Sequence, residues 1–481
     1  MDNNEIKNEV PVKKPKKKPE AEILLDRQLE MKDKTKGTDI AILACFCAFI
    51  LFFGVMFFIL PDKEYSATEK RALAQMPSMS FSRVASDLKR DLKLMTMTED
   101  EKKAYIAELG DSYKVFSDEI GDYYADQFPF RDQLRVVKAA TEIGMLKQEN
   151  NDVVFAKGYL IKKDSVSGVT MDEDKTIRDR TYGDAVETIK TNVHMIYGIQ
   201  SNLPEGVDVR AAVAGRTVDV ASSKLPFMFP YEDTHADLYW QAYGEQVNGD
   251  GVAAVELRGV LKERLDAGEY VYYKTDHHWT SLGAYYAYCE IIKSYGIEPY
   301  ALDTFTRETF TTSFLGTTFA KAGAAFGGAD TIELFRYDGD EDYTTQIFKG
   351  DKKTVLNGFY NKDKYRDIND KYSVFIGSDD TGDGGNNAVT IVTKNTSEKR
   401  PKMLLIKDSF GNSIVPFLAR HFDLVILDLS AGSSNFSEYL DDPDLAHILI
   451  LNNMETFMND TENVPYAATI IIPYYRQKEA K

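Results

Sequence analysis

The chain has 481 residues, of which 43% are hydrophobic and 28% are charged, and this composition indicates a folded protein with an extensive core. Its 76 acidic residues outnumber its 58 basic residues and give a formal net charge of −18. Because nucleic-acid binding depends on basic surface, this balance argues against a nucleic-acid partner.

The first 60 residues predict a membrane anchor. Residues 1–37 are rich in lysine and proline, which indicates a disordered, basic cytoplasmic tail. Residues 40–60 are apolar or small and uncharged, and at ~1.5 Å per residue they span a hydrocarbon core of about 30 Å. This run lacks the small-residue cleavage pattern of a signal peptide, so we expect an uncleaved transmembrane helix over residues 38–60. The upstream lysines favour a cytoplasmic N-terminus and an extracytoplasmic remainder in the cell envelope.

The part of the chain after residue 60 is expected to consist of two regions. Residues 61–150 are charged and have helical spacing, as in Leu88, Leu92 and Met95, so we predict a helical juxtamembrane region. From residue 151 to residue 481, short apolar runs alternate with helical stretches, which predicts a three-layer α/β/α domain with a mostly parallel sheet. The strand candidates are residues 207–214, 252–257, 389–392, 403–406, 424–427 and 447–451.

The three cysteines predict no internal disulfide outside the membrane. Cys45 and Cys47 fall in the apolar run, which leaves Cys289 as the single cysteine of the exported part. Cys289 lies in a stretch with helical spacing, and we interpret it as a buried apolar residue.

A hexapeptide at residues 275–280, Thr-Asp-His-His-Trp-Thr, is the strongest chemical signal. It holds two of the six histidines and one of the two tryptophans. An aspartate two residues before a histidine suits nucleophilic catalysis, because a carboxylate fixes the tautomer of the imidazole and stabilises its charged form. Thr280 and Ser281 are expected to cap a helix over residues 283–292.

Ser409 is the candidate nucleophile. Residues 403–406 are apolar and predict a buried strand, and the polar residues after them predict a turn. A helix could begin at residues 413–418, with Pro416 in its first turn. A serine between a strand end and a helix start lies at the carboxyl edge of an α/β sheet, where ligands bind.

These segments together resemble the DHHW family. This family is related to the alginate O-acetyltransferases AlgJ and AlgX and belongs to the wider SGNH-hydrolase-like group. The resemblance runs from about residue 60 to the C-terminus. Besides residues 276–279 and 407–409, the matching blocks are residues 128–132 (Phe-Pro-Phe-Arg-Asp), 158–160 (Gly-Tyr-Leu), 272–274, 281–286, 314–317 (Phe-Leu-Gly-Thr) and 372–375.

Carried over to this chain, the resemblance implies an SGNH-hydrolase-like fold and a catalytic triad of Ser409, His278 and Asp276. Two positions depart from the pattern of the wider group. Lys407 stands where ordinary SGNH hydrolases have glycine, and residues 377–380 lack an expected asparagine, although residues 384–386 read Gly-Gly-Asn. Trp279, Tyr273 and Asn412 are the candidates for binding substrate, and for Trp279 core packing is favoured over stacking on a sugar.

Other readings of the histidines stay open. The pair could simply be packed and hydrogen-bonded to backbone. Adjacent residues of an extended segment point to opposite sides, so His278 is expected to face the site and His277 the other way, which disfavours a shared metal. The other histidines show no ligand spacing, and we predict no metal or other cofactor. The acidic stretches 338–342 and 379–384 match no EF-hand loop and are expected to be solvated.

The resemblance implies that the protein is an O-acetyltransferase that forms an acyl-serine intermediate and acetylates an extracellular polysaccharide. By the same resemblance, a multi-pass membrane acyltransferase would deliver the acyl group. An O-acetylesterase with the same triad is one alternative. A membrane-anchored scaffold or glycan-binding protein without catalysis is the other.

Overall fold

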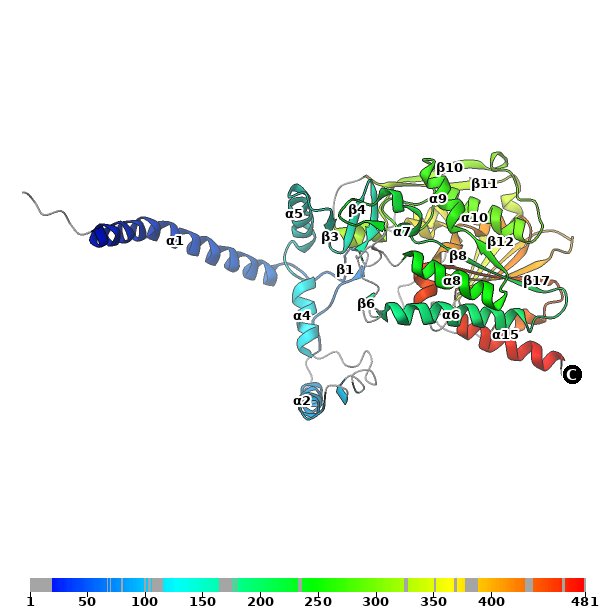
Figure 1. Cartoon of the computed structure of the whole chain (residues 1–481), viewed down its shortest axis with the longest axis horizontal. Coiled ribbons are helices and arrows are strands. Elements are labelled where there is room, and N and C mark those ends of the chain that lie inside the picture. The colour runs from blue at the N-terminus through cyan, green and yellow to red at the C-terminus, as the bar shows by residue number, and fades with distance from the viewer. Residues whose placement is uncertain are drawn as a thin grey trace, which may run out of the picture. The chain divides into compact units, whose positions relative to one another are not determined.

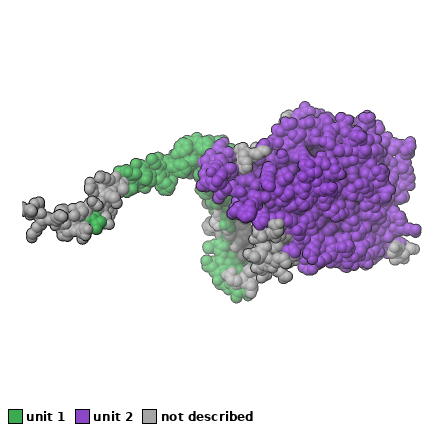
Figure 2. Space-filling model, turned by 45° about the horizontal axis from the view of Figure 1, so that its top comes forward, with its two compact units in different colours: residues 1–64, 73–131 green, residues 65–72, 132–481 purple. Residues whose placement is uncertain are grey.

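The computed structural model describes residues 20–479, apart from residues 67, 70, 79–80, 99–100, 103–104, 106–115, 164–175, 178–179, 232–235, 324–327, 350–351, 367–369, 377–387, 429–435 and 461–462. The chain forms two compact units (Figure 2). One comprises residues 1–64 and 73–131, and the other comprises residues 65–72 and 132–481.

The first unit contains the membrane-anchor candidate. Helix α1 (Glu20–Ile59) includes the apolar stretch Gly37–Ile59, which is long enough to cross a membrane and contains no residue that is buried inside the protein. This finding is compatible with the predicted single-pass anchor. The same unit contains α2 (Phe81–Met95) and α4 (Phe116–Asp126). The ring of Phe53 stacks on Phe128, with centroids 5.2 Å apart, so the Phe-Pro-Phe block packs against the end of α1.

The second unit is built on an eight-stranded mixed sheet (Figure 1). Its strands follow the order β13-β12-β14-β16-β15-β17-β8-β9, in which the run from β16 to β9 is parallel and β14, β12 and β13 are antiparallel. The bounds are β8 (Asp208–Ala214), β9 (Ala254–Glu256), β12 (Tyr343–Lys349), β13 (Lys352–Asn357), β14 (Ala388–Lys394), β15 (Lys402–Lys407), β16 (Asp423–Leu427) and β17 (Leu445–Asn453). All six strand candidates coincide with strands of this sheet, and the prediction of a mostly parallel sheet is confirmed.

Helices cover both faces of the sheet, because each central strand is apolar on both sides. Along β15, Met403 and Leu405 face one core cluster, and Leu404 and Ile406 face the other. The first cluster is closed by α9 (Arg258–Asp266), α10 (Ser281–Ser294) and α13 (Val415–Leu418), and the second by α6 (Tyr182–Gln200), α8 (Ala236–Asp250), α14 (Met454–Asn459) and α15 (Asn463–Glu479) (Figure 1). The predicted α/β/α layering is therefore confirmed.

Smaller elements complete the unit. A three-stranded sheet joins β3 (Glu149–Asn150), β4 (Val153–Ala156) and β5 (Tyr159–Lys162), and an antiparallel ribbon pairs β10 (Thr306–Phe314) with β11 (Asp330–Arg336). The remaining described elements include β1 (Tyr65–Ser66), β2 (Arg71–Ala72), β6 (Thr176–Ile177), β7 (Arg180–Thr181), α5 (Arg131–Gly144), α7 (Thr217–Val220), α11 (Thr317–Ala322) and α12 (Lys362–Tyr365).

Helix α10 begins as predicted and packs unusually close to a neighbouring loop. Thr280 is its N-cap and accepts a hydrogen bond from the Gly283 N–H, at 3.2 Å. A Cβ on Gly283 would overlap the carbonyl oxygen of Val271 and lie 3.0 Å from Cβ of Trp279. Because backbone is on the other side of this contact, the position requires glycine.

We therefore expect Gly283→Ala to destabilise the protein, by about 1–3 kcal/mol as for other overpacked core sites. Thermal unfolding of the full chain in detergent measures the change. The matched control is Gly244→Ala in α8, where nothing lies within 4 Å of the new Cβ and helix propensity favours alanine. An unchanged melting temperature for Gly283→Ala would contradict the close packing.

His421, which follows α13, is expected to make the stability of the protein depend on pH. Its Nε2 lies 2.8 Å from the hydroxyl of Tyr288, which donates to the neutral imidazole. Burial and the charges of Arg400 and Arg420 lower the pKa of His421 from 6.5 to about 4. The unfolded chain therefore binds this proton more readily than the folded protein does.

The contribution of His421 to stability is present above pH 6.5 and is lost as the pH falls from 6.5 towards 4. His421→Gln cannot take up this proton. We expect the melting-temperature difference between wild type and variant to shrink across that interval. A difference independent of pH would show that His421 does not titrate there.

Candidate active site

Ser409 lies in the turn that follows β15, at the carboxyl edge of the sheet. Asp408 caps the short 3-10 helix Ser409–Asn412, and its Oδ1 accepts from the Phe410 N–H at 2.9 Å. Its Oδ2 accepts from the Asn453 N–H at 2.7 Å, which ties the turn to the end of the adjacent strand β17. Burial raises the pKa of Asp408 despite these hydrogen bonds. Ser409 remains partly exposed, and α13 follows with Pro416 in its first turn, as predicted.

The Asp-His-His-Trp loop is held by the first residue of β11. Asp330 accepts hydrogen bonds from the backbone N–H of Lys274 at 2.9 Å and of Thr275 at 2.7 Å. The Thr275 hydroxyl also donates to this carboxylate, at 2.5 Å. The loop consequently has fixed bends and is not an extended strand.

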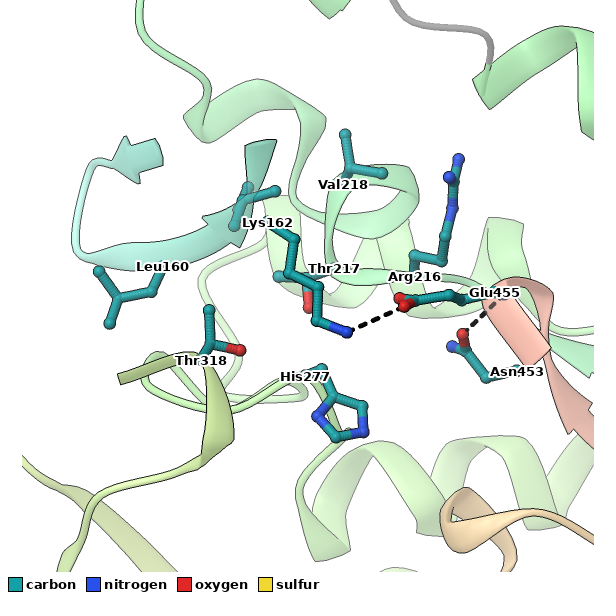
Figure 3. A pocket seen from close by; sticks show the side chains of 10 residues that line it. Leu160, Lys162, Arg216, Thr217, Val218, His277, Thr318, Asn453 and Glu455 are labelled. Carbon is teal, nitrogen blue, oxygen red and sulfur yellow. Dashed lines mark hydrogen bonds and ion pairs between the residues drawn. The ribbon is translucent and has the colours of Figure 1, made fainter. Parts of the chain in front are cut away.

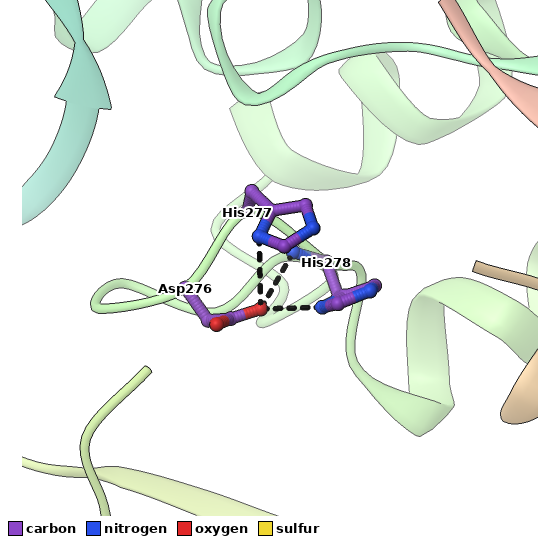
Figure 4. Close-up of side chains that lie close together, drawn as sticks. All are labelled: Asp276, His277 and His278. Atoms are coloured by element: carbon purple, nitrogen blue, oxygen red, sulfur yellow. Dashed lines mark hydrogen bonds and ion pairs between the residues drawn. The ribbon is translucent and has the colours of Figure 1, made fainter. Parts of the chain in front are cut away.

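The two segments meet at His278. Its Nε2 lies 2.7 Å from Oγ of Ser409, and its Nδ1 lies 2.5 Å from Oδ1 of Asp276 (Figure 4 shows the second contact). With Nδ1–H donating to the carboxylate, Nε2 is left to accept the proton of the serine hydroxyl. The structure thus brings Ser409, His278 and Asp276 into one hydrogen-bonded chain.

Asp276 is buried, with 2% of its surface exposed, and both of its oxygens are engaged. Its Oδ2 accepts from the N–H of Thr317 at 2.7 Å and from the Thr317 hydroxyl at 3.1 Å. Burial disfavours the charged form, but His277, His278 and these hydrogen bonds outweigh it and hold the pKa of Asp276 well below its usual range. The carboxylate is therefore charged and fixed in orientation.

Gly316 allows Thr317 to come within hydrogen-bonding distance of the Asp276 carboxylate. A Cβ at this position would overlap the Asp276 side chain and lie 2.7 Å from its Cα. The Phe-Leu-Gly-Thr block thus brings a glycine and a hydrogen-bond donor to the carboxylate. The family resemblance includes this block but assigns no role to it.

Tyr372 packs directly on the imidazole of His278. Their ring centroids are 4.1 Å apart with an interplanar angle of 15°. The Tyr372 hydroxyl donates to the carbonyl oxygen of Ser409 at 3.2 Å. Tyr372 therefore contacts both the imidazole and the nucleophile turn, a role that no spacing in the sequence signals.

The side chains expected to bind substrate are inside the protein. Trp279, Tyr273 and Asn412 are exposed by 0%, 1% and 4%. The indole Nε1–H of Trp279 donates to the carbonyl oxygen of Phe410 at 3.0 Å and to Oγ of Ser413 at 2.9 Å. The substrate-binding expectation does not fit this burial, and for Trp279 the alternative of core packing does.

His277 does not point away from His278, as alternation had predicted. The two ring centroids are 3.9 Å apart, and Nδ1 of His277 lies 2.8 Å from Oγ1 of Thr317. The prediction failed because alternation holds for extended strands, whereas this loop bends. His277 is nevertheless a hydrogen-bonding residue, as expected.

Asp276, His277 and His278 could in principle form a metal site, because one ligand atom from each lies within 4.8 Å of the others. The direct contact between His278 Nδ1 and Asp276 Oδ1, at 2.5 Å, leaves no room for an ion between them. Metal–ligand bonds of about 2.0–2.1 Å would separate these atoms by about 3 Å or more. The arrangement fits a proton relay better than a metal centre.

The structure shows what surrounds Lys407, which stands where ordinary SGNH hydrolases have glycine, and what surrounds one residue of the acidic stretch 338–342. The Lys407 side chain is buried and its Nζ binds Asp428 at 2.7 Å, while Gly411 leaves room for its methylenes. In the stretch 338–342, Asp340 is buried and pairs with Arg420 and Arg336, so it is not a solvated residue. Residues 377–380, 379–384 and 384–386 lie outside the described residues.

Comparison with known proteins agrees with the resemblance read from the sequence. Residues 257–427, which include the hexapeptide and Ser409, match the family model described as DHHW protein. The chain is 23% identical over 173 residues to the probable alginate O-acetylase AlgJ of Pseudomonas fluorescens. That match covers 36% of this chain and 40% of the relative's length.

Solved structures give weaker likenesses. A DHHW family protein from Eubacterium siraeum has 18% identity and a TM-score of 0.49, covering 66% of this chain and 96% of that one. PatB1 of Bacillus cereus with a sulfonyl adduct has 19% identity and a TM-score of 0.49, covering 64% and 96%. The O-acetyltransferase domain of Pseudomonas putida AlgJ has 14% identity and a TM-score of 0.38, covering 68% and 99%.

Because Gly316 lies against Asp276, we expect Gly316→Ala to displace the carboxylate and loosen His278. Small misplacements of reacting groups cost up to about 100-fold in rate, so labelling of Ser409 by phenylmethanesulfonyl fluoride should slow at least tenfold. Intact-mass measurements on the full chain follow the labelling, with Gly244→Ala as control. Labelling at the wild-type rate would show that the Asp276 contact does not govern serine reactivity.

Proposed function

We propose that the protein is a membrane-anchored acyltransferase that O-acetylates an extracytoplasmic polysaccharide. The proposal is supported by the match of residues 257–427 to the DHHW family model and by the similarity to AlgJ. The observation that carries the proposal is the hydrogen-bonded chain from partly exposed Ser409 through His278 to buried Asp276. Acyl transfer needs such an activated hydroxyl.

In the first step, Oγ of Ser409 attacks the acyl carbonyl of the donor while Nε2 of His278 takes the hydroxyl proton. Asp276 stabilises the imidazolium that forms. The Ser409 N–H begins a 3-10 helix and has no acceptor within that helix, so it is available to donate to the developing oxyanion. The proton then passes from His278 to the leaving group, and acyl-Ser409 remains.

In the second step, a sugar hydroxyl gives its proton to Nε2 of His278 and attacks acyl-Ser409. The bond from the acyl carbon to Oγ of Ser409 breaks, and His278 returns the proton to the serine. Water in place of the sugar would make the same chain an O-acetylesterase. The likeness to AlgJ favours the sugar hydroxyl.

The proposal also places the active site outside the cytoplasm. It is supported by the apolar stretch Gly37–Ile59, which could span a membrane, and by the lysines that precede it. A multi-pass membrane acyltransferase would then supply the acyl group, since acyl donors of the cytoplasm do not reach the site.

The full chain, incubated with p-nitrophenyl acetate, should gain one acetyl group on Ser409. Ser409→Ala should abolish the adduct, and His278→Ala and Asp276→Asn should slow p-nitrophenol release by at least about 100-fold, in the range of general-base effects. Intact-mass spectrometry and absorbance provide the two readouts.

Ser201→Ala and His194→Ala are matched controls, since both residues are exposed on or next to α6. They should behave as the wild type. Equal turnover by wild type and Ser409→Ala, with no adduct, would refute the acyl-serine mechanism and favour a non-catalytic scaffold. An acetyl-Ser409 that is discharged at the same rate with and without oligosaccharide would favour the esterase.

A further inference from the structure

The Phe-Pro-Phe block, residues 128–130, has no part in the acyl-serine chemistry. It forms the turn that follows α4 and lies in the same compact unit as α1. The side chains of Phe128 and Phe130 are 42% and 39% exposed. No charged residue stands between Asp126 and Arg131, and those two residues pair with each other, with Oδ1 and Nη2 3.5 Å apart. The turn therefore presents two exposed aromatic rings and no charge.

Both rings contact the part of α1 that is long enough to span a membrane. Phe128 stacks on Phe53, with ring centroids 5.2 Å apart and an interplanar angle of 17°. Phe130 lies parallel to Phe52, with centroids 6.3 Å apart and an angle of 6°. Phe52 and Phe53 belong to the apolar stretch Gly37–Ile59, and at ~1.5 Å per residue they lie about 9–10 Å before its end.

That distance places the ring contacts inside the bilayer when α1 spans it. The stretch has 23 residues and is about 34 Å long, whereas a hydrocarbon core is about 30 Å thick, so only the ends of the stretch can project from the core. Side chains of a helix also point towards its N-terminus, which here means away from the membrane surface at residue 60. The rings of Phe52 and Phe53, and the rings stacked on them, therefore lie among the acyl chains.

Contacts nearer the end of α1 are more polar. Phe57 contacts the rings of Tyr123 and Tyr124, with centroids 5.8 and 5.2 Å apart. The Tyr123 hydroxyl donates to Oδ2 of Asp62, just beyond the apolar stretch, at 3.0 Å. Tyrosine collects at membrane–water interfaces because its ring is apolar and its hydroxyl is polar. The side chains of α4 and the turn thus change from polar to apolar in the same order as a bilayer does from its surface inwards.

The backbone of the turn is held level with Lys63, which follows the apolar stretch. Oε1 of Gln127 accepts from the Lys63 N–H at 2.9 Å, and Nε2 of Gln127 donates to the Lys63 carbonyl oxygen at 2.9 Å. Unpaired peptide groups are costly in hydrocarbon, but at the membrane surface water and headgroups can reach them. Only the two phenylalanine rings need to enter the acyl chains.

Phe130 adopts a backbone conformation that a bulky residue rarely takes. Its φ is 59°, in the left-handed region that favours glycine. In water, the strain of this conformation and the exposure of the ring are both unfavourable. Burial of the ring among acyl chains is favourable and offsets them.

We propose that residues 128–130 are a lipid-binding turn, whose two rings insert among phospholipid acyl chains beside α1 and hold the end of α4 at the membrane surface. The leaflet is the one on the side of residue 60. A depth of about 5–10 Å is typical of apolar side chains at membrane interfaces and agrees with the position of Phe52 and Phe53 along α1. The proposal rests on the membrane anchor proposed above and not on the acyl-serine chemistry.

Fluorescence quenching by brominated lipid tests the turn. The full chain carrying Phe128→Trp or Phe130→Trp is reconstituted, one chain per nanodisc, in phosphatidylcholine with or without bromine on its acyl chains. The wild type, with its two tryptophans, gives the background. We expect bromine to lower the fluorescence of each added tryptophan about twofold or more, because the ring lies among acyl chains.

Two further variants serve as controls. Tyr197→Trp on α6 replaces an aromatic residue that is as exposed as Phe130, at 38%, and its fluorescence should not change with bromine. Phe46→Trp, in the middle of the apolar stretch, should be quenched. Absence of quenching at position 46 would refute the anchor and the turn with it. Quenching at position 46 but not at 128 or 130 would refute the lipid-binding turn and favour a protein partner for the rings. Equal quenching at position 197 would show that the turn has no special access to lipid.

A second measurement leaves the sequence unchanged and so does not depend on the folding of a variant. The wild-type chain is irradiated in nanodiscs whose phosphatidylcholine carries a diazirine within the acyl chain, and the adducts are mapped by mass spectrometry. We expect adducts in α1 and at residues 128–130 and none in α6. Adducts in α1 alone would contradict insertion of the turn. Neither measurement requires acetyl-Ser409, so a failure of the acyl-serine chemistry is distinguishable from a failure of the membrane turn.

Discussion

The hydrogen bond between Asp276 and His278 is the interaction on which the arrangement of the site depends. A buried carboxylate stays charged only if its oxygens are engaged, and here His278 takes one while Thr317 takes the other. The requirement extends outwards, because Thr317 can reach Asp276 only if residue 316 has no side chain. One buried charge thereby fixes the orientation of the imidazole and the identity of its neighbours.

The parallel sheet supplies the second constraint. Strands β15, β17 and β8 are adjacent and parallel, so the turns at their carboxyl ends gather at one edge. Asn453, at the end of β17, binds Asp408 on one side and the carbonyl oxygen of Gly215 on the other. The same contacts that hold the Ser409 turn also build a wall of a small neighbouring pocket, which Asn453 lines (Figure 3).

The central strands were predictable because they are buried on both faces and therefore consist of continuous apolar runs, as in residues 403–406. Two strands that the sequence did not predict, β10 and β13, have the opposite character. Strand β10 (Thr-Arg-Glu-Thr-Phe-Thr-Thr-Ser-Phe) and β13 are largely exposed, and their polar sequences carry no strong period. In the site, the Asp-His pair could be singled out because the chain has only six histidines, whereas Ser409 was assigned through the family resemblance. Tyr372 could not, since a tyrosine that stacks on an imidazole looks like any other core aromatic.

The sequence by itself determined the membrane-span candidate, the α/β alternation and the residues able to activate a serine, because hydrophobic period and side-chain chemistry are local properties. Only the tertiary structure decided which side chains face which. The bend of the loop places His277 beside His278, and Trp279 lies buried in the core. Lys162 forms an ion pair with Glu455, which is far from it in the sequence. These outcomes depend on long-range packing, for which neighbouring residues in the chain carry no signal.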